Sequence, residues 1–322
     1  HYILERFFGE YTKEEYLSLE EDKFQKIVCA YLAEYAVKYF GEEQLESNSF
    51  TYRLKTILDN VMYLMKHIME ELSQSEFFVA DCELKIGEDI PSYTIVLPDG
   101  HKIAVCGSVD RVDIMQRADI TYLRIIDYKT GTKQFKLSDI LYGINLQMLL
   151  YLHSIEASGG DKYGEIVPAG ILYMPATVPY ISSDSLKSID KLPDELNKKL
   201  KMNGLLLKDT EIIHGMDKTD VATYIPVKIK AGEPVSSTSL ATLAEFGKIF
   251  KKVDMLIAEM GKNIYNGNIE AKPLKGGHDS CEYCPYDSVC AYRQSNPITC
   301  FSVDNKTVIE EITNEINGKE EE

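Results

Sequence analysis

The sequence lacks long apolar runs and lacks an excess of basic residues. None of its apolar stretches approaches the roughly 20 residues that a membrane-spanning helix needs, so no membrane partner is predicted. No charged-then-apolar secretory signal opens it. Lys and Arg number 35 against 51 Asp and Glu, a net charge of −16. That balance argues against a general nucleic-acid coat, which must neutralise phosphates. It leaves room for an enzyme acting on DNA, because metal-binding carboxylates add to the same negative sum.

The seven cysteines are too unevenly placed for a secreted disulfide framework. Four of them, Cys281, Cys284, Cys290 and Cys300, fall within 20 residues, which favours a reducing cytoplasm and a metal or cluster site. The first three have the spacing C-x2-C-x5-C, which suits three ligands of a zinc site or of an iron–sulfur cluster. A zinc site would recruit Cys300 or His278 as its fourth ligand. Buried thiols near a chain end are the plain alternative.

Changes in apolar periodicity divide the chain into regions. Residues 1–76 repeat apolar residues every three to four positions and predict helices, whereas short β-rich runs begin at residue 77. A "PDG" turn at 98–100 predicts a hairpin, and 138–157 returns to helical spacing, with Ser138 as a plausible N-cap. Residues 168–176 read as a buried strand, about 180–235 as an insertion, 238–266 as a long helix, and 301–322 as an acidic tail. One α/β core with a helical N-terminal region and a Cys-rich C-terminal segment accounts for this order.

The stretch "RIIDYKTG" at 124–131 is the strongest candidate for chemistry. Alternate residues of a strand share a face, so Asp127 and Lys129 are expected at the end of one apolar stripe. The preceding run "GSVDRVD" at 107–113 would bring either Asp110 or Asp113, but not both, to that face. Two carboxylates and a main-chain carbonyl form a hard oxygen site suited to Mg²⁺ or Mn²⁺. Ordinary strand-end charges are the alternative, and an isolated D-x-K triplet is most often that.

The helix predicted after this strand carries Gln147 and Tyr151 four residues apart, so both lie on one face. They could contact a nucleic-acid backbone or hold Lys129. Ordinary amphipathic polarity explains them equally simply.

The succession "GSVDRVD … IIDYKTG … LQMLLY" resembles the RecB-type branch of the PD-(D/E)XK nucleases over most of the chain. "PAGILYM", "LKMNGLLL" and the terminal Cys spacing point more narrowly to AddB-type nuclease domains. The resemblance implies a mixed central sheet flanked by helices, with a nuclease core over 77–300 and the Cys cluster at 281–290. It implies a Mg²⁺-dependent DNA exonuclease in a helicase–nuclease that processes double-strand breaks.

Carried over to this sequence, the resemblance implies that Asp110 and Asp127 are metal ligands together with the carbonyl of Tyr128. Lys129 is then the catalytic lysine, and Gln147 and Tyr151 match the motif that follows it. His1 matches the family's metal-binding His, because "HYILE" fits H-x-x-L-E. Two further carboxylates are weaker candidates: Asp113 fits an accessory acidic position, and Glu83 could add another.

The resemblance also bears on cysteines and partners. Cys281, Cys284 and Cys290 would hold a [4Fe–4S] cluster whose fourth Cys lies upstream of His1. The chain opens without a Met, so we expect a piece of a longer protein with an incomplete cluster. The expected partners are DNA, fed as a single strand, and an AddA-type helicase subunit. The alternatives are an inactive iron–sulfur or zinc module that binds nucleic acid, and a CRISPR-associated iron–sulfur exonuclease.

Overall fold

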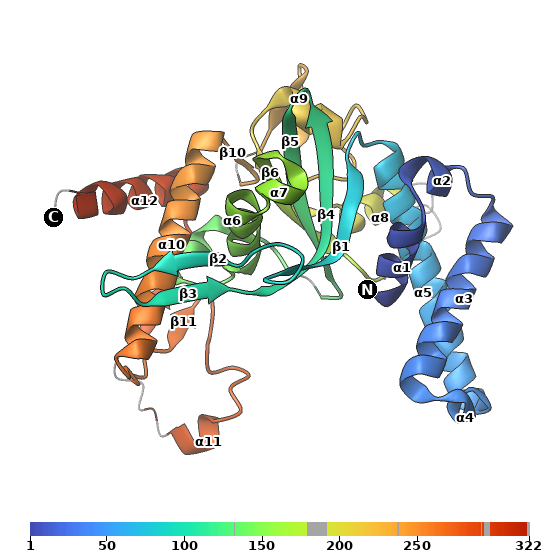
Figure 1. The fold of residues 1–322 in the computed structure, drawn as a ribbon, viewed down its shortest axis with the longest axis horizontal. Coiled ribbons are helices and arrows are strands. Elements are labelled where there is room, and N and C mark those ends of the chain that lie inside the picture. Colours follow the sequence, from blue (N-terminus) through green and yellow to red (C-terminus); the bar gives the residue numbers. More distant parts are fainter. Residues whose placement is uncertain (132, 179–191, 237, 291, 293–296, 321–322) are drawn as a thin grey trace.

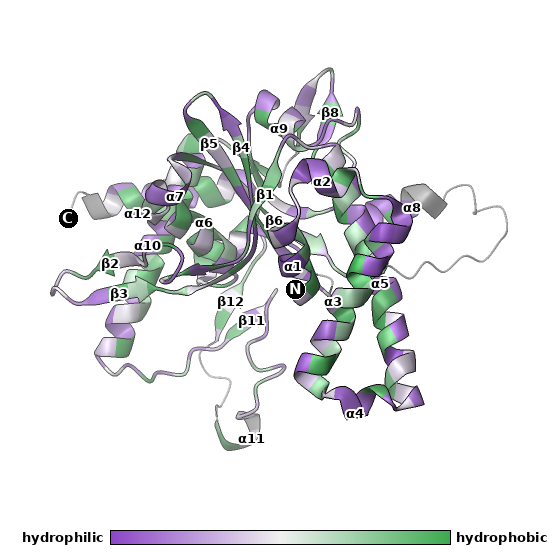
Figure 2. Ribbon diagram, turned by 45° about the vertical axis from the view of Figure 1, so that its right-hand side comes forward, coloured by the Kyte–Doolittle hydropathy of each residue, from purple (hydrophilic) through white to green (hydrophobic). Residues whose placement is uncertain are grey.

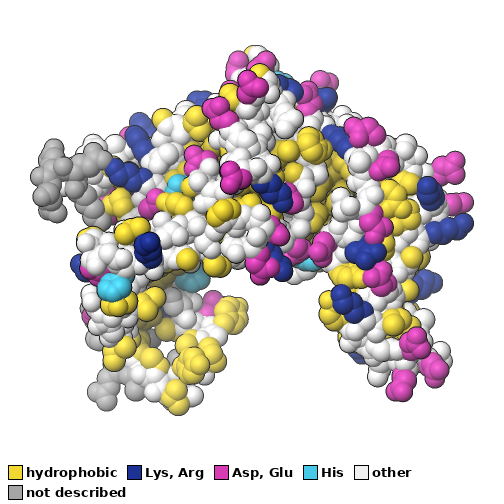
Figure 3. All heavy atoms as spheres, viewed as in Figure 1, with side chains coloured by type: hydrophobic (Ala, Val, Ile, Leu, Met, Phe, Trp, Pro, Cys, Tyr) yellow, Lys and Arg dark blue, Asp and Glu magenta, His cyan; other side chains and the backbone are white. Residues whose placement is uncertain are grey.

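The computed structural model describes residues 1–131, 133–178, 192–236, 238–290, 292 and 297–320. Figure 1 shows a body built on one twisted sheet, with a helical hairpin extending to one side and the Cys-bearing segment to the other. The space-filling view has a wide hollow between these two projections (Figure 3). Acidic and histidine side chains gather at the roof of this hollow, below the sheet.

The central sheet has six strands in the order β1-β4-β5-β6-β7-β10. Neighbours are antiparallel except for the pairs β5–β6 and β7–β10, which are parallel. This mixed sheet confirms the predicted fold class. The strands are β1 (Phe78–Ile86), β4 (Gly107–Arg117), β5 (Ile120–Lys129), β6 (Glu165–Pro175), β7 (Asn203–Leu207) and β10 (Leu240–Ala241).

The middle strands are buried on both faces because helices cover both sides. Leu123, Ile125 and Ile126 of β5 have no exposed surface, although they point to alternate faces. The apolar strands therefore form the centre of the molecule, as the colouring of Figure 2 shows. β7 lies inside the 180–235 stretch expected to be an insertion, so part of that stretch belongs to the sheet. Residues 179–191 are outside the described residues.

Three small two-stranded sheets complete the β structure. The predicted "PDG" turn joins two of these strands, with Gly100 at φ +87° and a hydrogen bond from Leu97 N to His101 O at 2.7 Å. The pairs are β2 (Tyr93–Val96) with β3 (Lys102–Val105), β8 (Lys228–Lys230) with β9 (Glu233–Val235), and β11 (Leu274–Gly276) with β12 (Ile298–Cys300).

The N-terminal region is helical, as expected for residues 1–76. Its helices are α1 (Tyr2–Glu10), α2 (Lys13–Leu17), α3 (Glu21–Phe40), α4 (Glu42–Leu45) and α5 (Asn48–Ser73). α1 packs against β1, while α3 and α5 form the projecting hairpin (Figure 1). The C-terminal end of α5 returns to the sheet, where Ile68 and Leu72 are fully buried.

The remaining helices are η1 (Leu137–Tyr142), α6 (Gln147–Ser158), α7 (Gly160–Tyr163), α8 (Leu192–Leu200), α9 (Thr210–Met216), α10 (Leu243–Tyr265), α11 (Asp287–Cys290) and α12 (Asn305–Glu320). Within the described residues, no helix combines the length and apolar character that crossing a membrane requires.

Two expectations for these segments were wrong. The helix expected over 138–157 is two elements, because Gly143 adopts a left-handed conformation (φ +67°) after η1. Ser138 lies inside η1 and caps neither. The second error concerns 301–322, expected to be an acidic tail. Most of it forms α12, which packs against α10 and η1 and buries Val308 and Ile312 completely.

Candidate active site

Strands β4 and β5 bring two carboxylates side by side. Arg111 pairs with Ile126 in their antiparallel register, so Asp110 lies next to Asp127 on the opposite face of the sheet. The Tyr128 amide donates a hydrogen bond to Asp110 Oδ2 at 2.9 Å. The Lys129 ammonium pairs with Asp127 Oδ2. The structure therefore gathers Asp110, Asp127 and Lys129, with the Tyr128 peptide between them.

His1 and Glu83 complete this cluster from neighbouring elements. Helix α1 begins directly after His1 and rests on β1 through Ile3, Leu4 and Phe7, which are buried. His1 is thereby held over the sheet, with Nδ1 2.7 Å from Glu83 Oε1 and Nε2 3.7 Å from Asp110 Oδ2.

The backbone of Glu83 is unusual for a strand residue. Its φ is +53°, a region that non-glycine residues seldom adopt, between pairs Cys82↔Arg111 and Leu84↔Val109. Ser108 Oγ donates to Glu83 Oε2 at 3.0 Å and holds the side chain in place. Strained backbone of this kind concentrates at functional sites. Glu83 therefore belongs to the cluster, which the sequence indicated only weakly.

Charge crowding at the cluster changes the affinity of its groups for protons. Burial raises the pKa of Asp110, as do the negative charges of Asp127 and Glu83, and these outweigh the lowering by the Tyr128 amide and His1. Burial lowers the pKa of His1, but its hydrogen bond to Glu83 and the charges of Asp110 and Asp127 raise it above its ordinary value. Crowded acidic groups of this kind would be relieved by a cation.

The donor atoms fit a divalent cation. His1, Glu83 and Asp110 each offer one ligand atom within 4.8 Å of the others, and no other such group of three occurs among the described residues. Asp127 stands outside this group and is held by Lys129. Carboxylate oxygens with one imidazole nitrogen suit Mg²⁺ or Mn²⁺. The carbonyl of Tyr128 as a further ligand stays a prediction.

Helix α6 approaches the start of β4 through Tyr151. A Cβ at Gly107 would lie 2.2 Å from the Tyr151 hydroxyl oxygen, so only glycine permits this approach. Gln147 Nε2 lies 3.5 Å from the same hydroxyl, at the limit of a hydrogen bond. The expected shared face is confirmed. Lys129 is held by Asp127, and no described hydrogen bond joins it to Gln147 or Tyr151.

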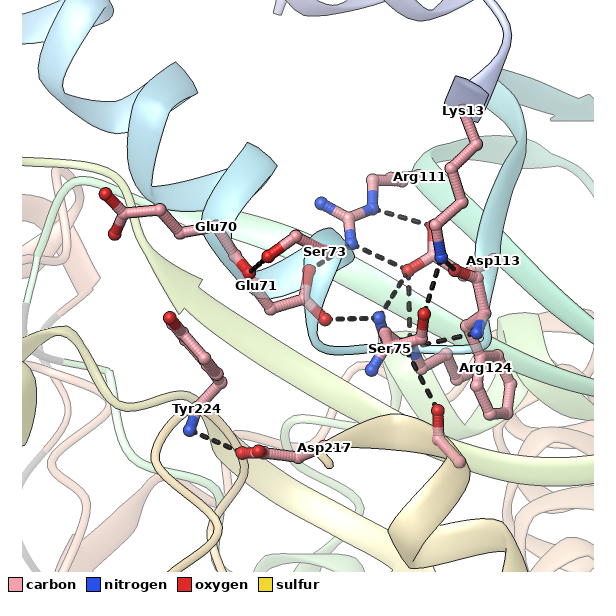
Figure 4. A network of polar contacts seen from close by, with 12 residues as sticks. Lys13, Glu70, Glu71, Ser73, Ser75, Arg111, Asp113, Arg124, Asp217 and Tyr224 are labelled. Carbon is pink, nitrogen blue, oxygen red and sulfur yellow. Dashed lines mark hydrogen bonds and ion pairs between the residues drawn. The ribbon is translucent and has the colours of Figure 1, made fainter. Parts of the chain in front are cut away.

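The accessory role expected for Asp113 was wrong. Asp113 lies on the other face of β4, where it is fully buried between Arg111 and Arg124. Figure 4 shows these three residues with Glu71 of α5, an ionic network that is at most 1% exposed. Burial alone would raise the pKa of Asp113, but the two guanidinium groups hold it below its usual value. Strand alternation separates Asp113 from the cluster, as it must when only one of the two acids can belong.

Comparison with known sequences agrees with this geometry. The sequence profile of the PD-(D/E)XK nuclease superfamily matches residues 1–291, which is most of the chain. The chain belongs to the PD-(D/E)XK nuclease superfamily.

Relatives of this nuclease chain share one name, that of the B-type subunit of an ATP-dependent helicase/deoxyribonuclease. A protein from Thermoanaerobacter sp. (strain X514) is 38% identical over 246 residues, covering 74% of this chain and 21% of the relative. One from Alkaliphilus metalliredigens (strain QYMF) is 33% identical over 308 residues, covering 92% and 26%. The AddB-type resemblance is thus confirmed. The chain spans about a quarter of the length of these relatives.

The cysteines of this nuclease chain do not form a ligand set as they stand. Cys281 and Cys284 are half-buried and Cys290 is exposed, and the group of His1, Glu83 and Asp110 is the only potential three-ligand set among the described residues. Cys300 is buried in β12, where its backbone accepts the Gly277 amide. The three sulfurs alone therefore do not fit a closed zinc or cluster site in this arrangement.

Proposed function

We propose that this chain hydrolyses DNA phosphodiester bonds with a divalent metal ion at the cluster of His1, Glu83, Asp110, Asp127 and Lys129. The observation that carries the proposal is the convergence of three ligand atoms within 4.8 Å beside an Asp–Lys pair. The cluster ends an otherwise apolar strand face, and acidic and histidine side chains gather at the roof of the open hollow (Figure 3).

Each residue has a distinct proposed role. Asp110 and Asp127, with His1 and the Tyr128 carbonyl, hold Mg²⁺ or Mn²⁺. The ion lowers the pKa of a bound water and braces a phosphate oxygen. Lys129 orients the attacking water or offsets charge on the phosphate, and Asp127 positions its ammonium group. Gln147 and Tyr151, on the neighbouring helix, are proposed to contact the DNA backbone.

The relatives' name supports a wider setting for the same site. We propose that the chain serves as an exonuclease in an AddAB-type helicase–nuclease, paired with an AddA-type helicase subunit in the cytoplasm. Its substrate is then a single strand unwound from a broken duplex, and its role is double-strand break repair and recombination.

The test is DNA cleavage with and without the metal. The chain should degrade end-labelled single-stranded DNA with Mg²⁺ or Mn²⁺ and stop when EDTA removes the ion. Asp110→Asn keeps the side-chain size but loses a charged ligand, so its rate should fall by about 10³-fold, equivalent to about 4 kcal/mol. Cleavage that resists EDTA, or that survives in Asp110→Asn, would show that the nuclease lies elsewhere.

For Cys281, Cys284 and Cys290 we propose three ligands of a [4Fe–4S] cluster whose fourth ligand comes from outside the described residues. The C-x2-C-x5-C spacing supports this. Protein purified anaerobically should contain iron and acid-labile sulfide and absorb visible light. A variant with all three cysteines replaced by serine should contain neither. Stoichiometric zinc without iron would contradict the cluster.

A further inference from the structure

A basic groove begins where the strand that carries Asp127 and Lys129 ends. It encloses about 650 Å³ and is lined by Thr130 and Gly131, which follow Lys129 directly. Four lysines also line it, Lys133, Lys198, Lys199 and Lys201, and none of its described lining residues is acidic. In a chain of net charge −16 such a concentration of positive charge is unusual.

The loop that carries Lys133 is fixed in place by the central sheet. Asn203, at the start of β7, accepts a hydrogen bond from the Phe135 amide at 2.7 Å. Its side-chain amide donates to the Lys133 carbonyl at 2.9 Å. Both ends of the Asn203 side chain therefore hold the loop. This is a positioned groove wall, with the half-buried Phe135 ring beside the lysines.

Lys129 and Lys133 point to the same aromatic ring. Their ammonium nitrogens lie 5.8 Å and 5.0 Å from the centroid of the Tyr173 ring. Burial lowers the pKa of Lys133, and the positive charge of Lys129 lowers it further. The pKa of Tyr173 is raised to about 12 by burial and then by the charge of Asp127, so this ring lies close to the catalytic cluster. An anion between the two ammonium groups would relieve their repulsion.

Not every lysine of the groove is available to a ligand. Lys201 donates to the carbonyls of Ala222 at 2.6 Å and Val227 at 3.0 Å, so its ammonium group holds the fold together. Lys198 lies in the last turn of α8 and is exposed. Lys133 and Lys198 are therefore the pair best placed to test.

We propose that this groove binds the phosphates of a single DNA strand adjacent to the phosphate being cleaved. The inference rests on the proposed nuclease function, and it places the DNA path on this chain's own lysines. A basic track beside aromatic rings is how proteins hold single strands without reading their sequence. The strand would run from the cluster at Asp127, past Lys129 and Tyr173, to Lys133 and Lys198.

The experiment compares Lys133→Ala/Lys198→Ala with a matched control that also loses two positive charges, Lys26→Ala/Lys55→Ala. Both control lysines are exposed on the projecting helices α3 and α5. Affinity for a labelled oligothymidine is measured in EDTA, where no cleavage occurs, over a series of salt concentrations. The groove variant should bind about tenfold more weakly, and the slope of log affinity against log salt should fall by about 1, whereas the control should match wild type.

Outcomes separate this proposal from the nuclease itself. Equal weakening in both variants would overturn the groove, because it would reflect net charge alone, and so would unchanged binding in the groove variant. Lys133→Arg/Lys198→Arg should restore affinity, and Lys198→Ala alone should show part of the loss even where Lys133→Ala fails to fold. Cleavage that survives Asp127→Asn would refute the nuclease function, whereas neutral lysines beside an Asp127-dependent cleavage would refute only the groove. Weaker binding of duplex DNA but not of the single strand would also contradict the proposal.

Discussion

Replacing Lys129 with alanine is expected to reduce metal-dependent DNA cleavage by about 10²–10³-fold, the scale seen when one charge-stabilising group is removed from an active site. Its ammonium group pairs with Asp127 and lies near the Tyr173 ring, where the groove meets the cluster. The loss should appear in kcat rather than in DNA affinity, because one phosphate contact among several contributes little to binding. Single-turnover cleavage with labelled single-stranded DNA, alongside binding in EDTA, measures both.

The comparison with Asp127→Asn makes this prediction specific. Removing Lys129 takes a positive charge from beside the carboxylates, so the affinity for Mg²⁺ should hold or increase. Asp127→Asn removes a proposed ligand and should weaken Mg²⁺ binding and cleavage together. Calorimetric titration with Mg²⁺ separates the two variants. A Lys129→Ala chain that cleaves at the wild-type rate would remove the catalytic assignment, and Lys129→Arg should retain more activity than alanine.

Strand periodicity was sufficient to predict the centre of the site. Asp127, Lys129 and the apolar stripe below them follow from the alternation of β5. The choice between Asp110 and Asp113 needed only the register of a hairpin, because the two lie on opposite faces. These relations are local, or one turn apart in sequence, so residue patterns are enough to reveal them.

The parts that the sequence did not reveal depend on contacts between distant segments. Glu83 reaches the cluster through a left-handed backbone at one position of β1, which no residue pattern indicates. The groove forms because Asn203 of β7 holds the loop at Lys133, 70 residues away. The helix expected over 138–157 breaks at Gly143, whose preceding and following residues have continuous helical spacing. Packing decides each of these outcomes.

The same limit applies to the buried ionic network. "DRVD" at 110–113 contains one acid for each face of β4, and the pattern does not indicate what surrounds its arginine. Arg111 is fully buried, donating to Asp113 at 2.7 Å and to Glu71 at 3.0 Å. Arg124 donates to the same two carboxylates and lies over the Phe77 ring at 4.9 Å (Figure 4). Two positive and two negative groups thus balance inside the protein.

Replacing Arg111 with leucine is expected to destabilise the fold by about 3–5 kcal/mol, because it leaves a buried carboxylate without its partner. The network would hold two acids against the single cation Arg124. Urea unfolding of both proteins, followed by circular dichroism, measures the change. Arg117→Leu on the same strand is the matched control. Its ion pair with Glu76 is half-exposed, so its loss should cost about 0–1 kcal/mol.

The double variant Arg111→Leu/Asp113→Asn distinguishes charge imbalance from lost packing. It removes one cation and one anion, so Glu71 and Arg124 remain as a balanced pair. It should be more stable than Arg111→Leu alone, and the difference from additivity measures the coupling between the two side chains. Equal instability would mean that packing of the Arg111 side chain, rather than its charge, holds β4 in place. Arg111 also lies 3.4 Å from the Tyr128 hydroxyl, and the Tyr128 amide binds Asp110. Restored stability should therefore come with partly restored cleavage.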